Sequence, residues 1–389
     1  MEPTKAAAAI REEHLDGWLF FNLRHRDAIS DAILQVSKRA LNTRPWIYLI
    51  RSGGEAVKLV HAIEAEILDH LPGEKRMYAS RAQLVEALKD LSRLCKRTAA
   101  QFSQDLPILS FLDHGTAELL SSCGFELRSS AGLIQRFLGL LDEGQMESHE
   151  NASRKLYRIV EEVWSRIGEE LQRGKGLSEG EVQGWMLSLF RREGLCSDSP
   201  PLVAAGRNSA NPHYQPAGKG APLKGGEVLQ LDLWAKQESP SAVFGDISWV
   251  GVLAAEAAPE VEAAFAAVVA ARQLALRFIG ESLDKGGSLT GAEVDRKVRS
   301  FLEEAGYGEG LKHRTGHGID TQAHGFGVNL DSVEFPDNRL LLEGSCFSIE
   351  PGVYLAEFGV RTEINVILRG GKAIVSGATP QSTLLLLDR

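Results

Sequence analysis

Four acidic residues stand out in this sequence, because each lies in a stretch that is otherwise typical of β-strands, where acidic residues are depleted. They are Asp232 and Asp246 in residues 228–252, and Glu350 and Glu363 in residues 347–368. Any one of them alone would be interpreted as part of a solvated strand face or as a turn cap. The four together predict a shared site.

These carboxylates would form a metal site if the two stretches face each other. Four negative charges in a partly dry pocket are prohibitive unless cations neutralise them, and two divalent ions would balance the charge. Oxygen-rich ligation completed by one imidazole suits Mn²⁺, Co²⁺, Fe²⁺ or Zn²⁺. Two such ions roughly 3.5 to 4 Å apart can activate water, so the pattern predicts hydrolytic chemistry.

A glycine-rich segment supplies candidates for the imidazole. Residues 313–324 hold three of the ten histidines of the chain, His313, His317 and His324, with a glycine on each side of His317. One of the three is the natural fifth ligand, although spacing alone does not select which. A chance cluster on a solvated loop explains this combination poorly.

Two β-hairpins are predicted to carry the four carboxylates. Their arms are residues 228–234 with 247–253, and residues 347–355 with 360–368. Because side chains alternate along a strand, Asp232 is expected on the face opposite its neighbouring leucines, and Arg361 and Glu363 are expected to share one face.

The distribution of apolar and polar residues along the whole chain predicts an α/β (α+β) protein of two domains, residues 1–145 and 146–389. In the first domain, helical patterns such as residues 82–94 alternate with short apolar runs. These runs begin at Trp18, Trp46 and Pro107. The stretch of residues 142–151 is almost wholly polar, and we place the domain boundary there.

Periodicity and capping signals predict helices in the second domain. Residues 156–167 repeat apolar side chains at helical spacing, with Ser148 or Asn151 as the expected N-cap. The spacing of capping boxes occurs in Ser178 with Glu181 and in Thr290 with Glu293. The longest apolar stretch, residues 261–279, is interrupted by charged residues and is predicted to be a buried helix rather than a membrane span.

Composition limits the partners and the compartment. The formal net charge of −9 argues against a nucleic-acid or anionic-membrane surface and favours small-molecule or peptide partners. The four cysteines are far apart and form no C-x-x-C pair, so neither a zinc knuckle nor a disulfide framework is predicted. We expect a cytoplasmic protein without a signal peptide.

Three short motifs resemble those of the pita-bread metallopeptidases, a family that includes methionine aminopeptidase, aminopeptidase P and prolidase. They are Gly316-His317-Gly318-Ile319 followed by His324, Ser348-Ile349-Glu350-Pro351-Gly352-Val353-Tyr354, and Gly359-Val360-Arg361-Thr362-Glu363. The resemblance implies an N-terminal creatinase/prolidase-like domain. It also implies a C-terminal pita-bread catalytic domain, in which helices flank a curved antiparallel sheet.

The resemblance further implies five ligands for two divalent ions. These ligands are Asp232, Asp246, His317, Glu350 and Glu363. Asp232 would bind one ion, Asp246 and Glu363 would bridge both, and His317 and Glu350 would bind the other. A metal-activated hydroxide would then attack the scissile carbonyl, and Glu350 would carry its proton to the leaving nitrogen.

Four further residues match positions that meet the substrate in the proline-directed branch of the family. They are His213, His313, His324 and Arg361, of which His213 and His324 also belong to the expected catalytic group. Arg361 has two interpretations of equal weight. It either contacts the substrate carboxylate or forms a salt bridge that only orients Glu363.

By the same resemblance, the expected function is that of a dinuclear Xaa-Pro dipeptidase, with Mn²⁺ as the first choice of metal and a homodimer as the expected assembly. The alternatives are an Xaa-Pro aminopeptidase for longer peptides, a catalytically silent binding module, and a metal-free hydrolase resembling creatinase. Two departures concern the pocket rim, since Asp320 replaces a usual glycine and Gly325 replaces a usual glutamate.

Overall fold

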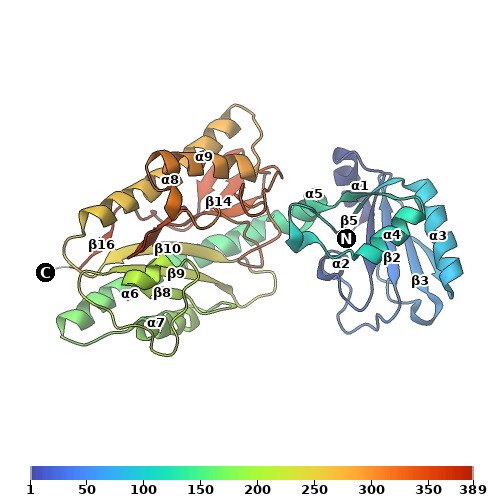
Figure 1. The fold of residues 1–389 in the computed structure, drawn as a ribbon. Helices are drawn as coiled ribbons and strands as arrows, with labels where there is room; N and C mark the ends of the chain where they lie inside the picture. The colour runs from blue at the N-terminus through green and yellow to red at the C-terminus, as the bar shows by residue number, and fades with distance from the viewer. Residues whose placement is uncertain (1, 388–389) are drawn as a thin grey trace. The chain divides into compact units, whose positions relative to one another are not determined.

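A computed structural model of the chain describes residues 2–387 and divides it into two compact units, Met1–Leu138 and Gly139–Arg389. Both units combine helices with β-sheets (Figure 1), which confirms the predicted mixed α/β class.

The N-terminal unit is built on a six-stranded sheet in the order β4-β3-β2-β1-β5-β6. Strand β2 pairs antiparallel with both β1 and β3. Strand β4 pairs parallel with β3, β5 pairs parallel with β1, and β6 pairs parallel with β5. Its strands are β1 (Gly17–Asn22), β2 (Trp46–Arg51), β3 (Ala56–His61), β4 (Glu74–Tyr78), β5 (Arg97–Ala100) and β6 (Glu126–Ser129). Its helices are α1 (Pro3–Glu12), α2 (Ala28–Leu34), α3 (Arg81–Leu94), α4 (His114–Ser122) and α5 (Ala131–Ile134).

The C-terminal unit places its sheets between two pairs of helices (Figure 1). Helices α6 (Glu143–Gln172) and α7 (Glu179–Arg192) contact the sheet around β9, whereas α8 (Pro259–Asp284) and α9 (Gly291–Glu304) belong to the half around β14. The strands of the first half are β7 (Leu195–Cys196), β8 (Leu202–Ala205), β9 (Val228–Gln237), β10 (Gly245–Val252) and β16 (Leu385–Leu386). Those of the second half are β11 (Cys346–Ile349), β12 (Gly352–Tyr354), β13 (Gly359–Arg361), β14 (Ile364–Arg369) and β15 (Lys372–Val375).

The first predicted hairpin is confirmed. Strands β9 and β10 pair antiparallel, with Asp246 opposite Trp234 and Ser248 opposite Asp232. Every residue of β10 is buried, and most of β9 is buried as well. The two aspartates therefore lie inside the unit and not on a solvated strand face.

The second predicted hairpin is interrupted, so the expectation of two continuous arms was wrong. Strand β11 pairs with β14 and strand β12 pairs with β13, and the two ladders are separate. Glu350 and Pro351 lie in the gap on one side and Thr362 and Glu363 in the gap on the other. Proline has no N–H for a ladder bond, so pairing breaks beside the two glutamates.

Helix α6 begins earlier than predicted. Its N-cap is Asp142, whose side chain accepts a hydrogen bond from the Gln145 N–H in a capping box, so the prediction of Ser148 or Asn151 was wrong. The polar stretch interpreted as a boundary forms the first turns of this helix. The expected capping boxes at Ser178 and Thr290 are confirmed.

The structure also differs from the α/β alternation predicted for the apolar run that begins at Pro107. It forms a short 3-10 helix, Pro107–Leu109, and not a strand. Proline fixes φ near the helical value and cannot donate to a sheet ladder, which favours the turn.

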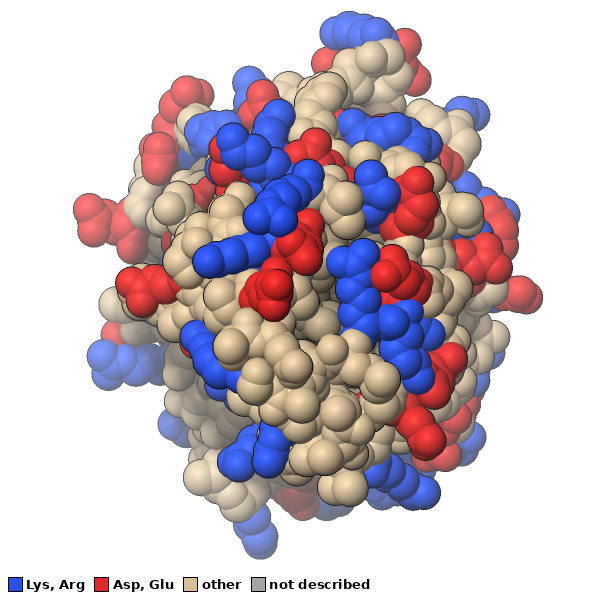
Figure 2. Space-filling view, turned by 90° about the vertical axis from the view of Figure 1, so that its right-hand side faces the viewer, with Lys and Arg blue, Asp and Glu red and all other residues tan. Residues whose placement is uncertain are grey.

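Helix α8 is the one helix in the described residues with the length and hydropathy of a membrane span. Its buried residues, among them Val261, Phe265, Val268 and Ile279, belong to the core of the second half of the unit. The core helix of a globular domain meets the same criteria. On the face of the molecule in Figure 2, basic and acidic side chains are interspersed.

Close packing between α6 and β10 generates a first prediction. A Cβ atom added at Gly251 would lie 2.1 Å from the Trp164 ring, so Gly251→Ala should lower the free energy of unfolding by about 1–3 kcal/mol. Gly184→Ala on α7, where nothing lies within 4 Å of the added atom, is the control and should be neutral or stabilising by up to ~1 kcal/mol. Denaturant titration of both variants measures this, and equal stabilities would contradict the packing.

Candidate metal centre

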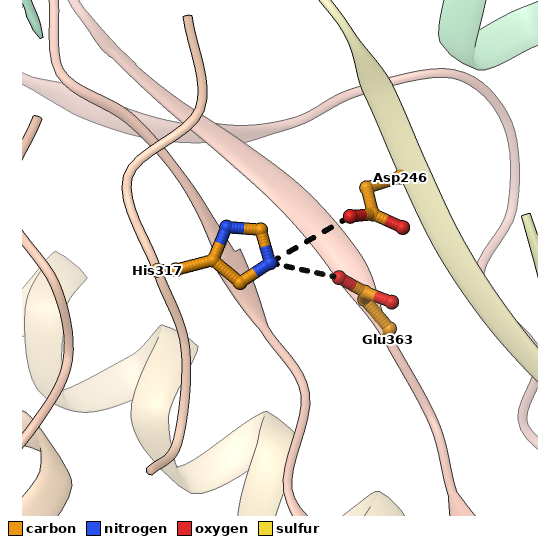
Figure 3. A group of neighbouring side chains, drawn as sticks. All are labelled: Asp246, His317 and Glu363. Carbon is orange, nitrogen blue, oxygen red and sulfur yellow. Dashed lines mark ion pairs between the residues drawn. The ribbon is translucent and has the colours of Figure 1, made fainter. Parts of the chain in front are cut away.

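Three side chains from distant parts of the sequence converge in the C-terminal unit. Asp246 comes from β10, Glu363 from the gap before β14, and His317 from the loop before β11. Their ligand atoms all lie within 4.8 Å of one another, and all three residues are buried. Figure 3 shows the imidazole pointing at both carboxylates, with His317 Nε2 3.6 Å from Asp246 Oδ2 and 4.0 Å from Glu363 Oε1.

Glu350 and Asp232 complete the cluster. Glu350 Oε1 lies 3.3 Å from His317 Nε2. Asp232 is joined to the cluster by the Ser248 hydroxyl, which lies 2.6 Å from Asp232 Oδ1 and 3.1 Å from Glu363 Oε2. The structure therefore brings together all five residues that the sequence singled out as ligands.

Backbone contacts hold these residues in place. The Asp246 N–H donates to Asn365 Oδ1 at 2.8 Å, and the Glu363 N–H donates to the Ser248 carbonyl at 3.2 Å. The Glu350 N–H donates to the Thr315 carbonyl at 2.7 Å, which joins the histidine loop to the end of β11. The side chains thus start from anchored backbone positions.

Glycine is required where the histidine loop approaches β11. A Cβ atom at Gly316 would lie 2.0 Å from the Ser348 carbonyl oxygen. The adjacent His317 N–H donates to Ser348 Oγ at 3.0 Å. A larger residue at position 316 would push His317 away from the carboxylates.

Burial and mutual repulsion shift the ionisation of the cluster. Burial raises the pKa of Asp246 and of Glu363 well above their usual range, and the neighbouring carboxylates raise both further. Burial likewise raises the pKa of Glu350 to about 7, although Arg361 acts in the opposite direction. Burial lowers the pKa of His317 well below its usual value, so its imidazole is neutral at pH 7.

The donor set fits divalent metal ions. Glu363 Oε1 is buried without a hydrogen-bond partner among the described residues, and it faces the neutral imidazole of His317. An unpaired buried carboxylate oxygen is costly unless a cation meets it. Four carboxylates with one imidazole match the preference of Mn²⁺, Co²⁺, Fe²⁺ or Zn²⁺.

Arg361 is buried and held by contacts within the site. Its Nη2 donates to Asp232 Oδ2 at 2.5 Å, its Nε to Ser248 Oγ at 3.0 Å, and its Nη1 to the Tyr354 hydroxyl at 2.9 Å. The guanidinium therefore pairs with Asp232 and not with Glu363, which the salt-bridge interpretation had proposed as its partner.

The remaining predicted histidines occupy different surroundings. His313 is half-buried, and its Nε2 lies 2.7 Å from the Tyr354 hydroxyl. Its pKa is lowered to about 3 by burial and by the Arg361 charge. The ring of His324 lies 4.2 Å from that of His317, centroid to centroid, whereas His213 is exposed on the loop after β8.

The two departures at the pocket rim compensate for each other. The Asp320 carboxylate is buried and accepts from the Gln322 N–H at 2.8 Å and the Phe326 N–H at 2.7 Å. A Cβ atom at Gly325 would lie 2.4 Å from that carboxylate. Asp320 thus fills the space that a side chain at position 325 would need, and it closes the turn that carries His324.

Sequence reasoning missed two residues of the centre. Ser248 was not singled out from the sequence, and Tyr354 was named only as part of a family motif, yet both contact Arg361. The cross-strand register offered a signal for Ser248, because it pairs directly with Asp232. No local signal in the sequence identifies the partner of Tyr354.

A prediction follows from the raised pKa of Glu350, about 7, for protein kept free of divalent ions with EDTA. The folded state keeps this proton over a range in which the unfolded chain, with a pKa near 4.5, releases it. The stabilisation is therefore complete below about pH 4.5 and is lost as the pH rises through about 7. Relative to Glu350→Gln, the wild type should lose about 3 kcal/mol between pH 4 and pH 8.

Denaturant titrations at several pH values measure this difference. His317, whose pKa is lowered by burial, contributes with the opposite sign in both proteins. Glu357→Gln, which alters an exposed carboxyl nearby, should follow the wild type. If the free energies of unfolding of the wild type and of Glu350→Gln changed with pH in parallel, the raised pKa of Glu350 would be contradicted.

Comparison with known proteins agrees with this arrangement. The sequence pattern of metallopeptidase family M24 matches residues 151–369, more than half of the chain. The Xaa-Pro dipeptidase of Lactobacillus delbrueckii subsp. lactis is 34% identical over 163 residues, which cover 42% of this chain and 40% of that protein. The chain spans about half the length of the curated relatives it matches.

Solved structures share the fold over nearly the whole chain. The Xaa-Pro dipeptidase of Bacillus anthracis is 20% identical and superposes with a TM-score of 0.64, covering 99% of both chains. The X-Pro aminopeptidase of Thermotoga maritima MSB8 is 23% identical, with a TM-score of 0.61 and the same coverage. With its family pattern spanning the five clustered residues, this chain belongs to metallopeptidase family M24.

Proposed function

We propose that this protein is a dinuclear-metal-dependent Xaa-Pro dipeptidase. The observation that carries the proposal is the convergence of three carboxylates on one neutral imidazole, with Asp232 joined to them through Ser248, inside the segment that matches the M24 family. Xaa-Pro dipeptidases among the relatives support the substrate class.

The five clustered residues would hold the ions, with Asp246 and Glu363 placed between the others. Two bound divalent ions would supply Lewis acidity and an activated water near neutral pH. The chain itself supplies neutral His317 as a nitrogen donor and Ser248 as a hydrogen-bond partner for two of the acids.

Glu350 is the candidate for proton transfer. Without ions, burial raises the pKa of its carboxyl group to about 7. A carboxylate beside the activated water can carry a proton from that water to the leaving nitrogen. His313 is held by the Tyr354 hydroxyl and the Arg314 carbonyl, so its ring has a defined orientation toward a substrate. With His324 and His213, it forms the proposed substrate-facing group.

An Xaa-Pro aminopeptidase for longer peptides is the second candidate, because the Thermotoga maritima enzyme has the same fold. A silent binding module has less support, since all five predicted ligands are present and clustered. Mn²⁺ as the metal, a homodimeric assembly and a cytoplasmic location remain part of the proposal.

Metal binding itself can be tested by thermal unfolding with and without Mn²⁺. Wild-type protein should gain stability from Mn²⁺, since an ion that binds only the folded state raises the melting temperature. Asp246→Asn should weaken Mn²⁺ binding by about 100-fold or more. Even residues that only hydrogen-bond to a metal ligand change the metal affinity by about 10- to 100-fold when they are mutated.

In EDTA, the same variant should be at least as stable as the wild type, because it removes one repelling charge. Asp284→Asn, at an exposed position at the end of α8, is the control and should keep the wild-type response. A wild-type Mn²⁺ response in Asp246→Asn would remove Asp246 from the metal centre.

Substrate length distinguishes the two candidate functions. With Mn²⁺ present, the proposal expects a higher kcat/KM for Ala-Pro than for Ala-Pro-Ala, measured by release of free alanine or proline. A strong preference for the tripeptide would favour the aminopeptidase. Glu350→Gln should abolish turnover of both peptides while keeping the fold, and a wild-type rate would exclude Glu350 from the reaction.

A further inference from the structure

Glu179 is a fully buried carboxylate outside the metal centre. It is the first residue of α7 and directly follows the N-cap Ser178. Four neutral donors from residues 205–221 contact its two oxygens, namely the Ala205 N–H at 2.8 Å, the Asn208 amide at 2.9 Å, the Tyr214 hydroxyl at 2.7 Å and the Ala221 N–H at 2.7 Å. A carboxylate accepts about four hydrogen bonds, so this one segment uses the whole capacity of Glu179.

Residues 205–221 close around this carboxylate. Ala205 ends β8 and Ala221 precedes β9, so Glu179 joins both ends of the segment to each other. Gly220 has a φ of +65°, and a Cβ atom there would lie 2.7 Å from Glu179 Oε2. A buried charge is costly unless hydrogen bonds satisfy it, and the positive end of a helix favours a carboxylate. The segment is therefore fixed at the start of α7.

The same segment reaches the metal centre on its other side. The Gly359 N–H donates to Ser209 Oγ at 2.9 Å, which joins the segment to β13. Arg361 Nη1 lies 3.4 Å from the Pro212 carbonyl. Residues 205–221 thus connect the buried end of α7 with the arginine of the centre.

His213 lies between these two sets of contacts. Pro212 before it contacts Arg361, and Tyr214 after it contacts Glu179. The His213 side chain is exposed, and among residues 2–387 its ring has no hydrogen-bond partner. An exposed loop of this kind is mobile unless hydrogen bonds hold it. The direction of the His213 ring therefore depends on the contacts of its two neighbours.

We propose that Glu179 is a positioning residue for His213, an inference that rests on the proposed peptidase function. Under that function, His213 belongs to the substrate-facing group. Glu179 acts through Tyr214, whose hydroxyl it holds directly beside His213 in the chain. The ring is thereby oriented before the substrate arrives, which lowers the cost of ordering it on binding.

Loss of this support should reduce turnover more than it reduces metal binding. The four hydrogen bonds of the Glu179 carboxylate all lie within residues 205–221. None of the five predicted metal ligands lies in that range. A variant that only loosens the segment should therefore keep the rise in melting temperature that Mn²⁺ causes in the wild type.

A double-mutant cycle with His213 tests the route of the effect, with Ala-Pro as substrate and Mn²⁺ present. Tyr214→Phe keeps the ring and should lower kcat/KM by about fivefold or more, because a hydrogen bond to a charged group is lost. His213→Ala should lower kcat/KM by about tenfold or more. In the His213→Ala background, Tyr214→Phe should change kcat/KM by less than about twofold, because the two residues act as a unit.

Two further variants complete the comparison. Glu179→Gln turns an amide group toward one pair of donors, so it should cause a larger fall that also depends on His213. Tyr48→Phe loses a phenolic hydrogen bond to the Pro72 carbonyl in the N-terminal unit and should keep the wild-type kcat/KM. If Glu179→Gln does not fold, Tyr214→Phe carries the test.

Hydrogen exchange gives a second measurement without turnover. The backbone amides of residues 205–221 should exchange faster in Tyr214→Phe and in Glu179→Gln than in the wild type. An equal loss of kcat/KM from Tyr214→Phe with and without His213 would overturn the positioning role, as would wild-type exchange rates in both variants or a wild-type kcat/KM in His213→Ala. Failure of the wild type to cleave any Xaa-Pro peptide would overturn the proposed function instead, and the exchange rates would still show whether Glu179 holds the segment.

Discussion

The gathering of four carboxylates around one imidazole, three of them within 4.0 Å of it, is the constraint on which the C-terminal unit depends. Like charges repel, and burial removes the water that would otherwise stabilise them. Both effects raise the pKa of Asp246 and Glu363. An unsupported chain would separate these groups, so the surrounding fold has to hold them by contacts that do not involve the carboxylates themselves.

Side-chain amides supply much of that support. Gln230 on β9 accepts the Arg361 N–H at 3.0 Å and donates to the Arg361 carbonyl at 3.1 Å, which replaces a strand ladder between the two hairpins. Asn365 accepts the Asp246 N–H. Because these bonds satisfy backbone groups where the short ladders end, they fix the direction of the acidic side chains before any cation binds.

A hydrogen-bond chain extends from the acids to His313. It runs from Asp232 through Arg361 and the Tyr354 hydroxyl to His313. In a buried site such bonds reinforce one another, so the position of His313 depends on the arrangement at Asp232. Under the proposed function, one arginine would thereby connect the metal ligands with the orientation of the substrate.

The sequence by itself determined the ligand types, the first hairpin and the capping boxes at Ser178 and Thr290. These features could be predicted because strand alternation and helix caps depend on residues a few positions apart. The start of α6 was a local feature as well, but the sequence interpretation chose Ser148 or Asn151 as the cap and overlooked Asp142.

Spacing left the choice of histidine open and a family motif selected His317, but only the tertiary structure decided what Arg361 contacts and how Asp320 accommodates Gly325. Asp232 and Arg361 are 129 positions apart, so their pairing depends on how the two halves of the unit pack. At the break of the second hairpin, the Glu363 N–H donates to the Ser248 carbonyl of β10, a contact between residues 115 positions apart. Such contacts have no periodicity along the chain, and a pattern of residues cannot specify them.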